Sequence, residues 1–201
     1  MFSLDDSSRI FRYHHDLIKD HGVGNTLALG WRTSQEQSIR FETLAQIDDL
    51  NDRSVLDAGC GHADLYPWLK ARFPQMKNYC GVEQIPELVD EAIRRYGHFE
   101  DTRFIARSFL RGSLPVSDYV FVCGSLNYGS SKPGAIYDAI VLLFEACSMG
   151  LAFNLLKYMP VDSTLVAYNP EDILAFCRTL TANVIYKDGY APEDFTIFLY
   201  K

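Results

Sequence analysis

The chain has 201 residues and a mass of 22.9 kDa, and 48% of its residues are hydrophobic while 22% are charged. These values fit an ordinary one-domain globular protein and exclude a disordered or fibrous chain. Acidic residues outnumber basic ones by 26 to 19, which gives a net charge of −7. This balance disfavours DNA or RNA as a partner, because nucleic-acid affinity rests largely on Lys and Arg side chains that neutralise phosphates.

The cysteines and the amino-terminal segment bear on the environment of the protein. Five widely spaced cysteines without a CxxC pair argue against a disulfide framework and against a zinc site, so we expect no metal and a reducing, cytoplasmic location. The first 15 residues carry early acids and no apolar core, unlike a secretory signal. No uncharged apolar run approaches the roughly 20 residues that span a bilayer, so we expect no membrane partner.

The first 50 residues have helical patterns. Apolar residues predict one or two helices that are broken at Gly22–Gly24 and at Gly30, and Thr33–Leu50 predicts another helix. Because these segments precede the first strand, we interpret residues 1–50 as a helical cap or lid and residues 51–201 as the domain that it covers.

From residue 53 onward, short apolar runs alternate with helical patterns. Helices are expected over Ala63–Arg72, from Pro86, over Pro133–Met149 and from Asn169. The apolar runs predict seven strands, at Arg53–Asp57, Tyr79–Glu83, Arg103–Ala106, Asp118–Cys123, Gly150–Leu155, Asn183–Tyr186 and Phe195–Tyr200. This alternation predicts an α/β fold, with helical crossovers and a mostly parallel, doubly wound sheet. The last two strands are too close for a crossover helix, so they should pair antiparallel.

The strongest motif is Ser54–Leu65, with the sequence SVLDAGCGHADL. A buried strand ends at Asp57 and enters the turn Gly59-Cys60-Gly61, which opens directly into a helix. Glycines let the backbone approach a ligand closely, and a helix amino terminus offers free N–H groups. A dinucleotide site would have its third glycine at Asp64, where an acid repels a pyrophosphate. The motif therefore favours a ligand without phosphates that carries a positive charge.

These residues resemble the first motif of class I S-adenosylmethionine-dependent methyltransferases, hydrophobic-hydrophobic-D-x-G-x-G-x-G, with Ala63 in place of the third glycine. The resemblance covers Arg53–Lys201. It implies a Rossmann-like seven-stranded sheet with an antiparallel last strand, S-adenosylmethionine as cofactor and S-adenosylhomocysteine as product. It also implies that Glu83, at the end of the second strand, accepts hydrogen bonds from both ribose hydroxyls. Many members use an Asp to contact adenine, whereas this chain has Ser108.

Further cofactor contacts are implied around this motif. The cap stretch ALGWRTSQEQSIRF is similar to one in small bacterial methyltransferases of this type, which implies that Trp31 covers the pocket and that Arg40 pairs with the methionine carboxylate. The alternatives remain open: Asp57 and Glu83 as simple strand-end acids, and Trp31 as packing of the cap. The full expected set is Asp57, Gly59, Cys60, Gly61, Asp64, Glu83, Gln84, Ile85, Ser108, Phe109, Cys123, Gly124, Trp31 and Arg40.

The sequence alone assigns no catalytic residue. The fourth strand leads into CGSLNY, which differs from the [DN]PP[YF] motif of enzymes that methylate nucleic-acid bases or glutamine amides. A sulfonium already activates its methyl group, so a base is needed only where the acceptor must lose a proton. The candidates for such a base, or for contact with the acceptor, are Asn127, Tyr128, Tyr13, His14 and His15.

The resemblance therefore implies an enzyme that transfers a methyl group from S-adenosylmethionine to oxygen, nitrogen or a carboxylate of a small molecule by in-line displacement. Two alternatives remain, a protein side-chain methyltransferase and a non-catalytic S-adenosylmethionine-binding protein. A dehydrogenase is the weakest of these hypotheses. The expected partner is a small-molecule substrate, and the oligomeric state does not follow from the sequence.

Overall fold

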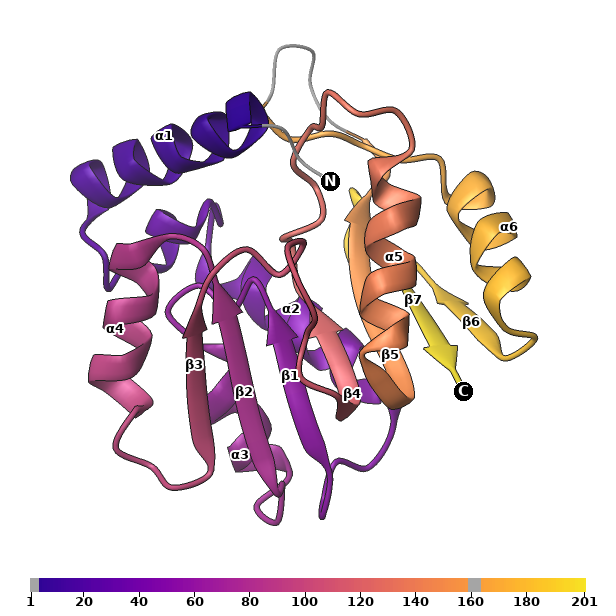
Figure 1. The fold of residues 1–201 in the computed structure, drawn as a ribbon, viewed down its shortest axis with the longest axis horizontal. Coiled ribbons are helices and arrows are strands. Elements are labelled where there is room, and N and C mark those ends of the chain that lie inside the picture. Colours follow the sequence, from indigo (N-terminus) through magenta and orange to yellow (C-terminus); the bar gives the residue numbers. More distant parts are fainter. Residues whose placement is uncertain (1–3, 159–163) are drawn as a thin grey trace.

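A computed structural model describes residues 4–158 and 164–201. Its centre is a seven-stranded sheet with the order β3-β2-β1-β4-β5-β7-β6 (Figure 1). Strands β1 to β5 pair parallel to their neighbours, whereas β7 lies antiparallel between β5 and β6. The predicted mixed sheet with an antiparallel last strand is confirmed. The strands are β1 (Ser54–Ala58), β2 (Asn78–Glu83), β3 (Thr102–Ala106), β4 (Ser117–Val122), β5 (Cys147–Leu156), β6 (Val184–Lys187) and β7 (Asp194–Tyr200).

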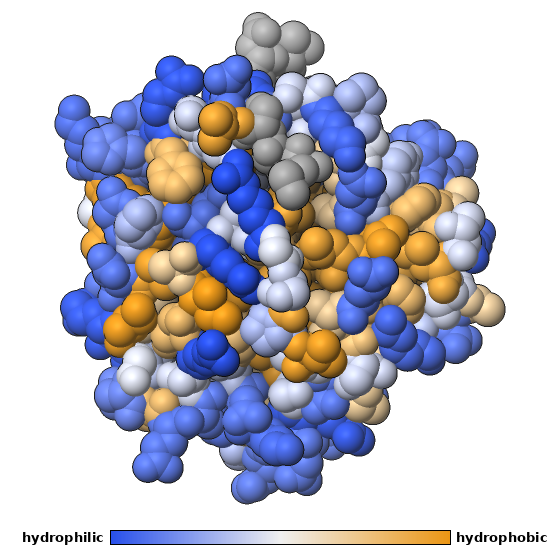
Figure 2. Space-filling model, viewed as in Figure 1, coloured by the Kyte–Doolittle hydropathy of each residue, from blue (hydrophilic) through white to orange (hydrophobic). Residues whose placement is uncertain are grey.

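Helices cover both faces of the sheet. One apolar cluster joins α5 and α6 to the sheet, and a second joins α2, α3 and α4 to it, with α5 and α3 on opposite sides in Figure 1. On the surface, apolar side chains gather over α5 and α6, in the right half of Figure 2. The helices are α1 (Leu4–His21), η1 (Thr26–Leu29), α2 (Ser34–Leu44), η2 (Ala45–Ile47), α3 (Leu65–Arg72), α4 (Pro86–Tyr96), α5 (Ala135–Glu145) and α6 (Pro170–Leu180).

Helix starts follow capping residues in the sequence. The Asn169 side chain accepts a hydrogen bond from the Glu171 N–H at 3.0 Å, and Pro170 follows at the first helical position of α6. The Thr33 hydroxyl accepts the Glu36 N–H at 3.2 Å at the start of α2. These local contacts fix where α6 and α2 begin, and α2 packs against β5.

Three predicted helix ends are wrong. The helix predicted over Thr33–Leu50 ends at Leu44 and is followed by the short η2. The helix predicted over Pro133–Met149 ends at Glu145, because the chain from Cys147 onward pairs with β4 and becomes the first part of β5. Tertiary pairing there overrides a helical pattern of apolar residues. The helix predicted from Ala63 begins at Leu65, since Ala63 has a left-handed φ of 64° that no α-helix accommodates.

One predicted crossover also lacks a helix. Residues 107–116, all of which the structure describes, join β3 to β4 by turns and extended chain alone. The two strands still run parallel within the sheet, so the connection crosses over without helical structure.

The first 50 residues occupy two places. Figure 1 shows α1 above the carboxyl ends of the strands, where Ile10 packs with Ile85 and Leu88. In contrast, Phe41 and Leu44 of α2 belong to the same apolar cluster as β1 and α3. Helix α2 therefore covers a sheet face, while α1 and η1 cover the strand ends. The boundary at residue 50 stays a prediction, and residues 1–3 of the predicted cap lie outside the described residues.

Candidate functional site

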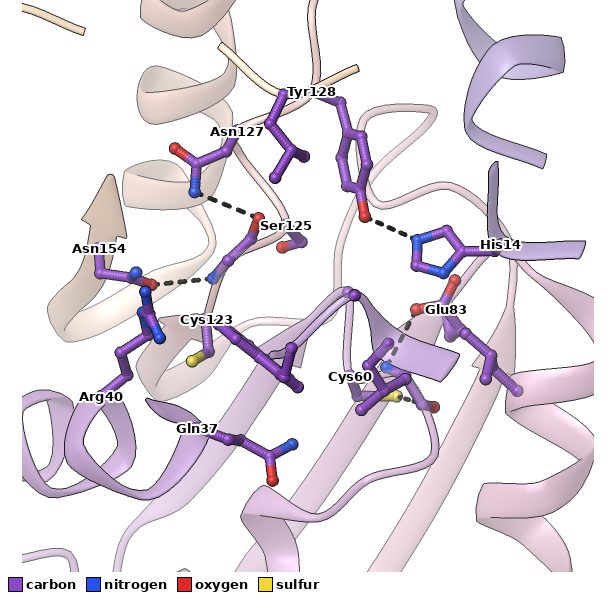
Figure 3. A pocket seen from close by; sticks show the side chains of 18 of the residues that line it. His14, Gln37, Arg40, Cys60, Glu83, Cys123, Ser125, Asn127, Tyr128 and Asn154 are labelled. Carbon is purple, nitrogen blue, oxygen red and sulfur yellow. Dashed lines mark hydrogen bonds between the residues drawn. The ribbon is translucent and has the colours of Figure 1, made fainter. Parts of the chain in front are cut away.

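A cavity of about 400 Å³ lies at the carboxyl ends of β1, β2 and β4, below α1 and beside α2 (Figure 3). This volume is within the range of small-molecule sites, and the location is where open α/β sheets bind ligands. The structure brings all fourteen residues of the expected cofactor set to the cavity wall, together with the acceptor candidates Tyr13, His14, Asn127 and Tyr128.

The glycine-rich turn is shaped by positions that a side chain cannot occupy. Gly59 has a φ of 81°, and a Cβ there would lie 2.4 Å from the Ser125 Cβ. Gly61 has a φ of 54°, and its Cβ would lie 2.6 Å from a Leu29 methyl group. The turn therefore packs closely against the segment after β4 and against η1. Only glycine meets both the conformation and the lack of space.

Glu83 is buried beside this turn. One carboxylate oxygen accepts the Gly61 N–H at 3.0 Å, and the other accepts the N–H groups of Gln84 at 2.6 Å and Ile85 at 2.8 Å. Burial raises the pKa of Glu83, while these three hydrogen bonds lower it. A carboxylate has about four acceptor positions, so about one is left for a ligand.

Asp57 is the second acid in this part of the wall. It is 2% exposed and accepts a hydrogen bond from the Tyr79 hydroxyl at 2.5 Å. Burial raises the pKa of Asp57 to about 7, the Tyr79 hydrogen bond works against this rise, and the negative charge of Glu83 adds to it. A carboxyl group with such a pKa is about half protonated at neutral pH, and a cation beside it would favour the ionised form.

Asp64 is held from two sides. One oxygen accepts a hydrogen bond from the Gln37 side chain of α2 at 3.2 Å, and the other from Arg95 of α4 at 3.0 Å. The neighbouring His62, 1% exposed, is absent from the cavity wall. Sequence reasoning missed Arg95, because nothing in the pattern of α4 marks one of its charged residues as facing the turn.

Arg40 also has a partner that the sequence did not indicate. Its guanidinium forms a buried ion pair with Asp194 at 2.5 Å, and its carbon lies 4.7 Å from the centre of the Trp31 ring. Its Nε is buried without a hydrogen-bond partner among the described residues. Trp31 packs so closely on Gly124 that a Cβ there would lie 2.8 Å from the ring. Arg40 is therefore held in the wall by Asp194 and by the Trp31 ring.

A hydrogen-bonded pair links α1 to the segment after β4. His14 Nδ1 lies 3.2 Å from the Ala28 carbonyl oxygen, and Nε2 lies 2.7 Å from the Tyr128 hydroxyl (Figure 3). A carbonyl oxygen only accepts, so Nδ1 carries the proton and Nε2 accepts the hydroxyl proton of Tyr128. Burial lowers the pKa of His14, which favours this neutral form.

Two other candidates, His15 and Asn127, differ in where the structure places them. The structure does not bring His15 to the cavity wall, since its side chain is 68% exposed and lies 3.8 Å from Glu87. It follows His14 directly on a helix, so the two side chains point in different directions. Asn127 lines the cavity, but its side chain accepts the Leu156 N–H at 2.9 Å and donates to the Gly124 carbonyl at 3.3 Å.

The described residues also show no metal site or membrane span. Across residues 4–158 and 164–201, no group of three His, Cys, Asp or Glu side chains is arranged to hold a metal ion. None of the helices in these ranges has the length and hydropathy of a membrane-crossing segment. Burial raises the pKa of the Cys60 and Cys123 thiols, so both are small apolar groups in the cavity wall.

The same fold occurs in solved methyltransferase structures. Magnesium protoporphyrin IX methyltransferase from Synechocystis PCC 6803 with bound SAM aligns over 99% of this chain and 98% of its own, at 16% identity and a TM-score of 0.70. Human N-acetylserotonin methyltransferase in complex with SAM aligns over 98% of this chain and 59% of its own, at 16% identity and a TM-score of 0.71. N-methyltransferase NodS from Bradyrhizobium japonicum WM9 in complex with S-adenosylhomocysteine aligns over 94% of this chain and 97% of its own, at 15% identity and a TM-score of 0.68.

The chain has the class I methyltransferase fold. No family profile matches the sequence, and no curated protein matches it. At these identities the likeness shows the fold alone.

Proposed function

We propose that this protein is an S-adenosylmethionine-dependent methyltransferase that acts on a small molecule. The observation that carries the proposal is the cavity itself, in which the glycine-rich turn meets the acids Asp57 and Glu83 at the strand ends of a methyltransferase fold. Solved proteins of this fold bind S-adenosylmethionine or its product, as their structures with these ligands show. When bound, the cofactor supplies a methyl group on a positively charged sulfur.

The turn and Glu83 fit the adenosine part of this cofactor. The turn has no room for side chains at Gly59 and Gly61, which leaves its backbone open to a ligand. Glu83 retains about one acceptor position for the ribose. For Glu83 to accept a hydrogen bond from a second ribose hydroxyl as well, one of the three backbone N–H groups would have to release the carboxylate. Ile85, Ser108 and Phe109 line the wall beside it and would hold the adenine.

Asp64 and Arg40 fit the amino-acid part. Asp64 has an ionic partner in Arg95 and would accept a hydrogen bond from the ammonium group of the cofactor. Arg40 lines the cavity, and its guanidinium would bind the carboxylate while the ion pair with Asp194 keeps it in place. The Trp31 ring lies over this guanidinium and would exclude water from the contact.

The His14–Tyr128 pair supplies a proton acceptor. Tyr128 donates its proton to His14, so its oxygen is free to accept the proton of a hydroxyl or amine in the cavity. As the acceptor atom bonds to the methyl carbon and the carbon–sulfur electron pair returns to sulfur, the acceptor proton would pass to Tyr128 and the Tyr128 proton to His14. A carboxylate acceptor would not need this relay.

A cavity of this size supports a small acceptor over a protein side chain. The neighbours include enzymes named for magnesium protoporphyrin IX and for N-acetylserotonin. Both are small molecules, which also supports a small acceptor. A protein side-chain methyltransferase and a non-catalytic binding protein remain the alternatives, and the cytoplasmic location stays a prediction.

Two measurements test the proposal. Calorimetric titration with S-adenosylmethionine, S-adenosylhomocysteine and NAD should show binding of the first two alone. Incubation with methyl-labelled S-adenosylmethionine and an extract that is split into small-molecule and protein fractions should then label the small-molecule fraction. Label in the protein fraction would favour the first alternative, and binding without any transfer would favour the second. Binding of NAD alone would overturn the proposal.

A further inference from the structure

Arg95 lies behind the cavity wall and joins three segments of the chain around it. From α4, its guanidinium donates to the Asp64 carboxylate at 3.0 Å and to the Gly24 carbonyl oxygen at 2.8 Å. Its Nε donates to Glu91, one turn earlier on α4, at 2.7 Å. Arg95 is not itself part of the cavity wall, whereas Asp64 is. One side chain therefore connects α4, the start of α3 and the loop that follows α1.

The chemistry of these contacts suits arginine alone. A guanidinium is planar and has five N–H donors in a fixed arrangement, so it can serve three acceptors at once, which a lysine ammonium on its flexible stem does less well. Glu91 is 7% exposed and anchors the guanidinium from α4. At Gly24, a Cβ would lie 3.0 Å from the guanidinium nitrogen, so glycine leaves the room for Arg95 to reach the carbonyl.

Asp64 shows what this anchoring does. The residue is at the start of α3, where an aspartate commonly turns its carboxylate to the free N–H groups of the first helical turn. In this structure Asp64 makes no such capping bond. One oxygen instead accepts a hydrogen bond from Arg95 and lies 3.0 Å from His62 Nδ1, the other accepts one from Gln37, and the side chain lines the cavity. Contacts from two other helices thus hold the carboxylate away from its own helix.

We propose that Arg95 is a positioning residue of the cofactor site, which fixes the Asp64 carboxylate at the cavity wall and the Gly24 loop beside it. The inference rests on the proposed function, because it takes the ligand of Asp64 to be the ammonium group that S-adenosylmethionine and S-adenosylhomocysteine share. Without Arg95, Asp64 is released toward its helix or solvent, and the cavity loses an aligned acceptor. Ligand affinity then falls, whereas the stability of the fold changes little.

Calorimetric titration with S-adenosylhomocysteine tests this role in four variants of the full chain. Arg95→Ala should weaken binding roughly tenfold, the size expected for a lost charge-assisted hydrogen bond. Arg94→Ala is the matched control, since Arg94 also pairs with Glu91 but its side chain is 70% exposed. This control should bind within about twofold of the wild type. Asp64→Asn and the double variant Arg95→Ala/Asp64→Asn complete a thermodynamic cycle.

The cycle separates positioning from a merely structural role. If Arg95 acts through Asp64, its removal should have little further effect once Asp64 is already Asn. Additive losses in the double variant, or unchanged affinity of Arg95→Ala, would overturn the inference. Thermal melts monitored by circular dichroism show whether each variant is folded at the titration temperature. If Arg95→Ala does not fold, Arg95→Lys replaces it in the cycle and should give an intermediate loss. A wild-type protein that does not bind S-adenosylhomocysteine would instead overturn the proposed function itself.

Discussion

Asp57 should make the stability of the protein depend on pH in a way that one substitution removes. Burial raises the pKa of its carboxyl group to about 7 in the folded chain, against an ordinary value of 3.8. The folded state therefore holds this proton over a pH range in which the unfolded chain has lost it. The contribution of Asp57 to stability is complete below about pH 4 and is lost as the pH rises through 7.

The size of the effect follows from the two pKa values. They differ by about three pH units, and each unit corresponds to about 1.4 kcal/mol, so the free energy of unfolding should fall by about 4 kcal/mol between pH 4 and pH 8 because of Asp57. Asp57→Asn keeps the size of the side chain and an oxygen that can accept the Tyr79 hydroxyl proton, but it cannot ionise. The variant should match the wild type near pH 4 and exceed its stability near pH 8.

Urea unfolding monitored by circular dichroism at several pH values between 4.5 and 8 measures the difference directly. Other groups titrate in both proteins, so their contributions cancel in the comparison. A difference between variant and wild type that stays constant across this range would refute the reasoning, because it would show that Asp57 is ionised throughout in the folded protein.

Four further predictions concern the cavity. Glu83→Ala should weaken S-adenosylhomocysteine binding by more than about tenfold, as measured by calorimetry, because a buried hydrogen-bonding group is lost. Gly124→Ala should reduce the same affinity, since its Cβ would press on the Trp31 ring at a φ of 75°, and the quenched or shifted tryptophan fluorescence should report the move. Tyr128→Phe should leave that affinity unchanged but slow transfer to a hydroxyl or amine acceptor at least about a hundredfold, in a labelled-methyl assay. Deletion of residues 1–30 should leave a folded sheet by circular dichroism and abolish turnover in the same assay.

The features that the sequence made predictable are those written into a few adjacent residues. The turn at Gly59 and Gly61 is one example, because a strand, two glycines and a helix follow one another without interruption. Glu83 is another, since an acid that ends a strand must lie at the edge where ligands bind. The antiparallel β7 follows from the short link that precedes it. In each case local chain geometry limits where the residue can be.

The contacts that the sequence could not show depend on parts of the chain that meet only after folding. His14 and Tyr128 are 114 positions apart, and Arg95 reaches Asp64 across 31 positions. The Arg40–Asp194 pair depends on the register between β5 and β7, where Asp194 is opposite Leu156. Similarly, the end of α5 at Glu145 is decided by pairing of the next residues with β4, which no local pattern reveals.

Most of the charged side chains that line the cavity are acidic. Among residues 4–158 and 164–201, six carboxylates but only two guanidinium groups, those of Arg32 and Arg40, line the cavity. Both guanidinium groups already form ion pairs, Arg32 with Glu36 and Glu193, and Arg40 with Asp194. A pyrophosphate would enter this excess of negative charge at a cost, whereas a sulfonium and an ammonium group would relieve it. Part of the acidic excess that gives the net charge of −7, which at first argued only against nucleic acid, therefore lies at the cavity, where it favours a cationic cofactor over a dinucleotide.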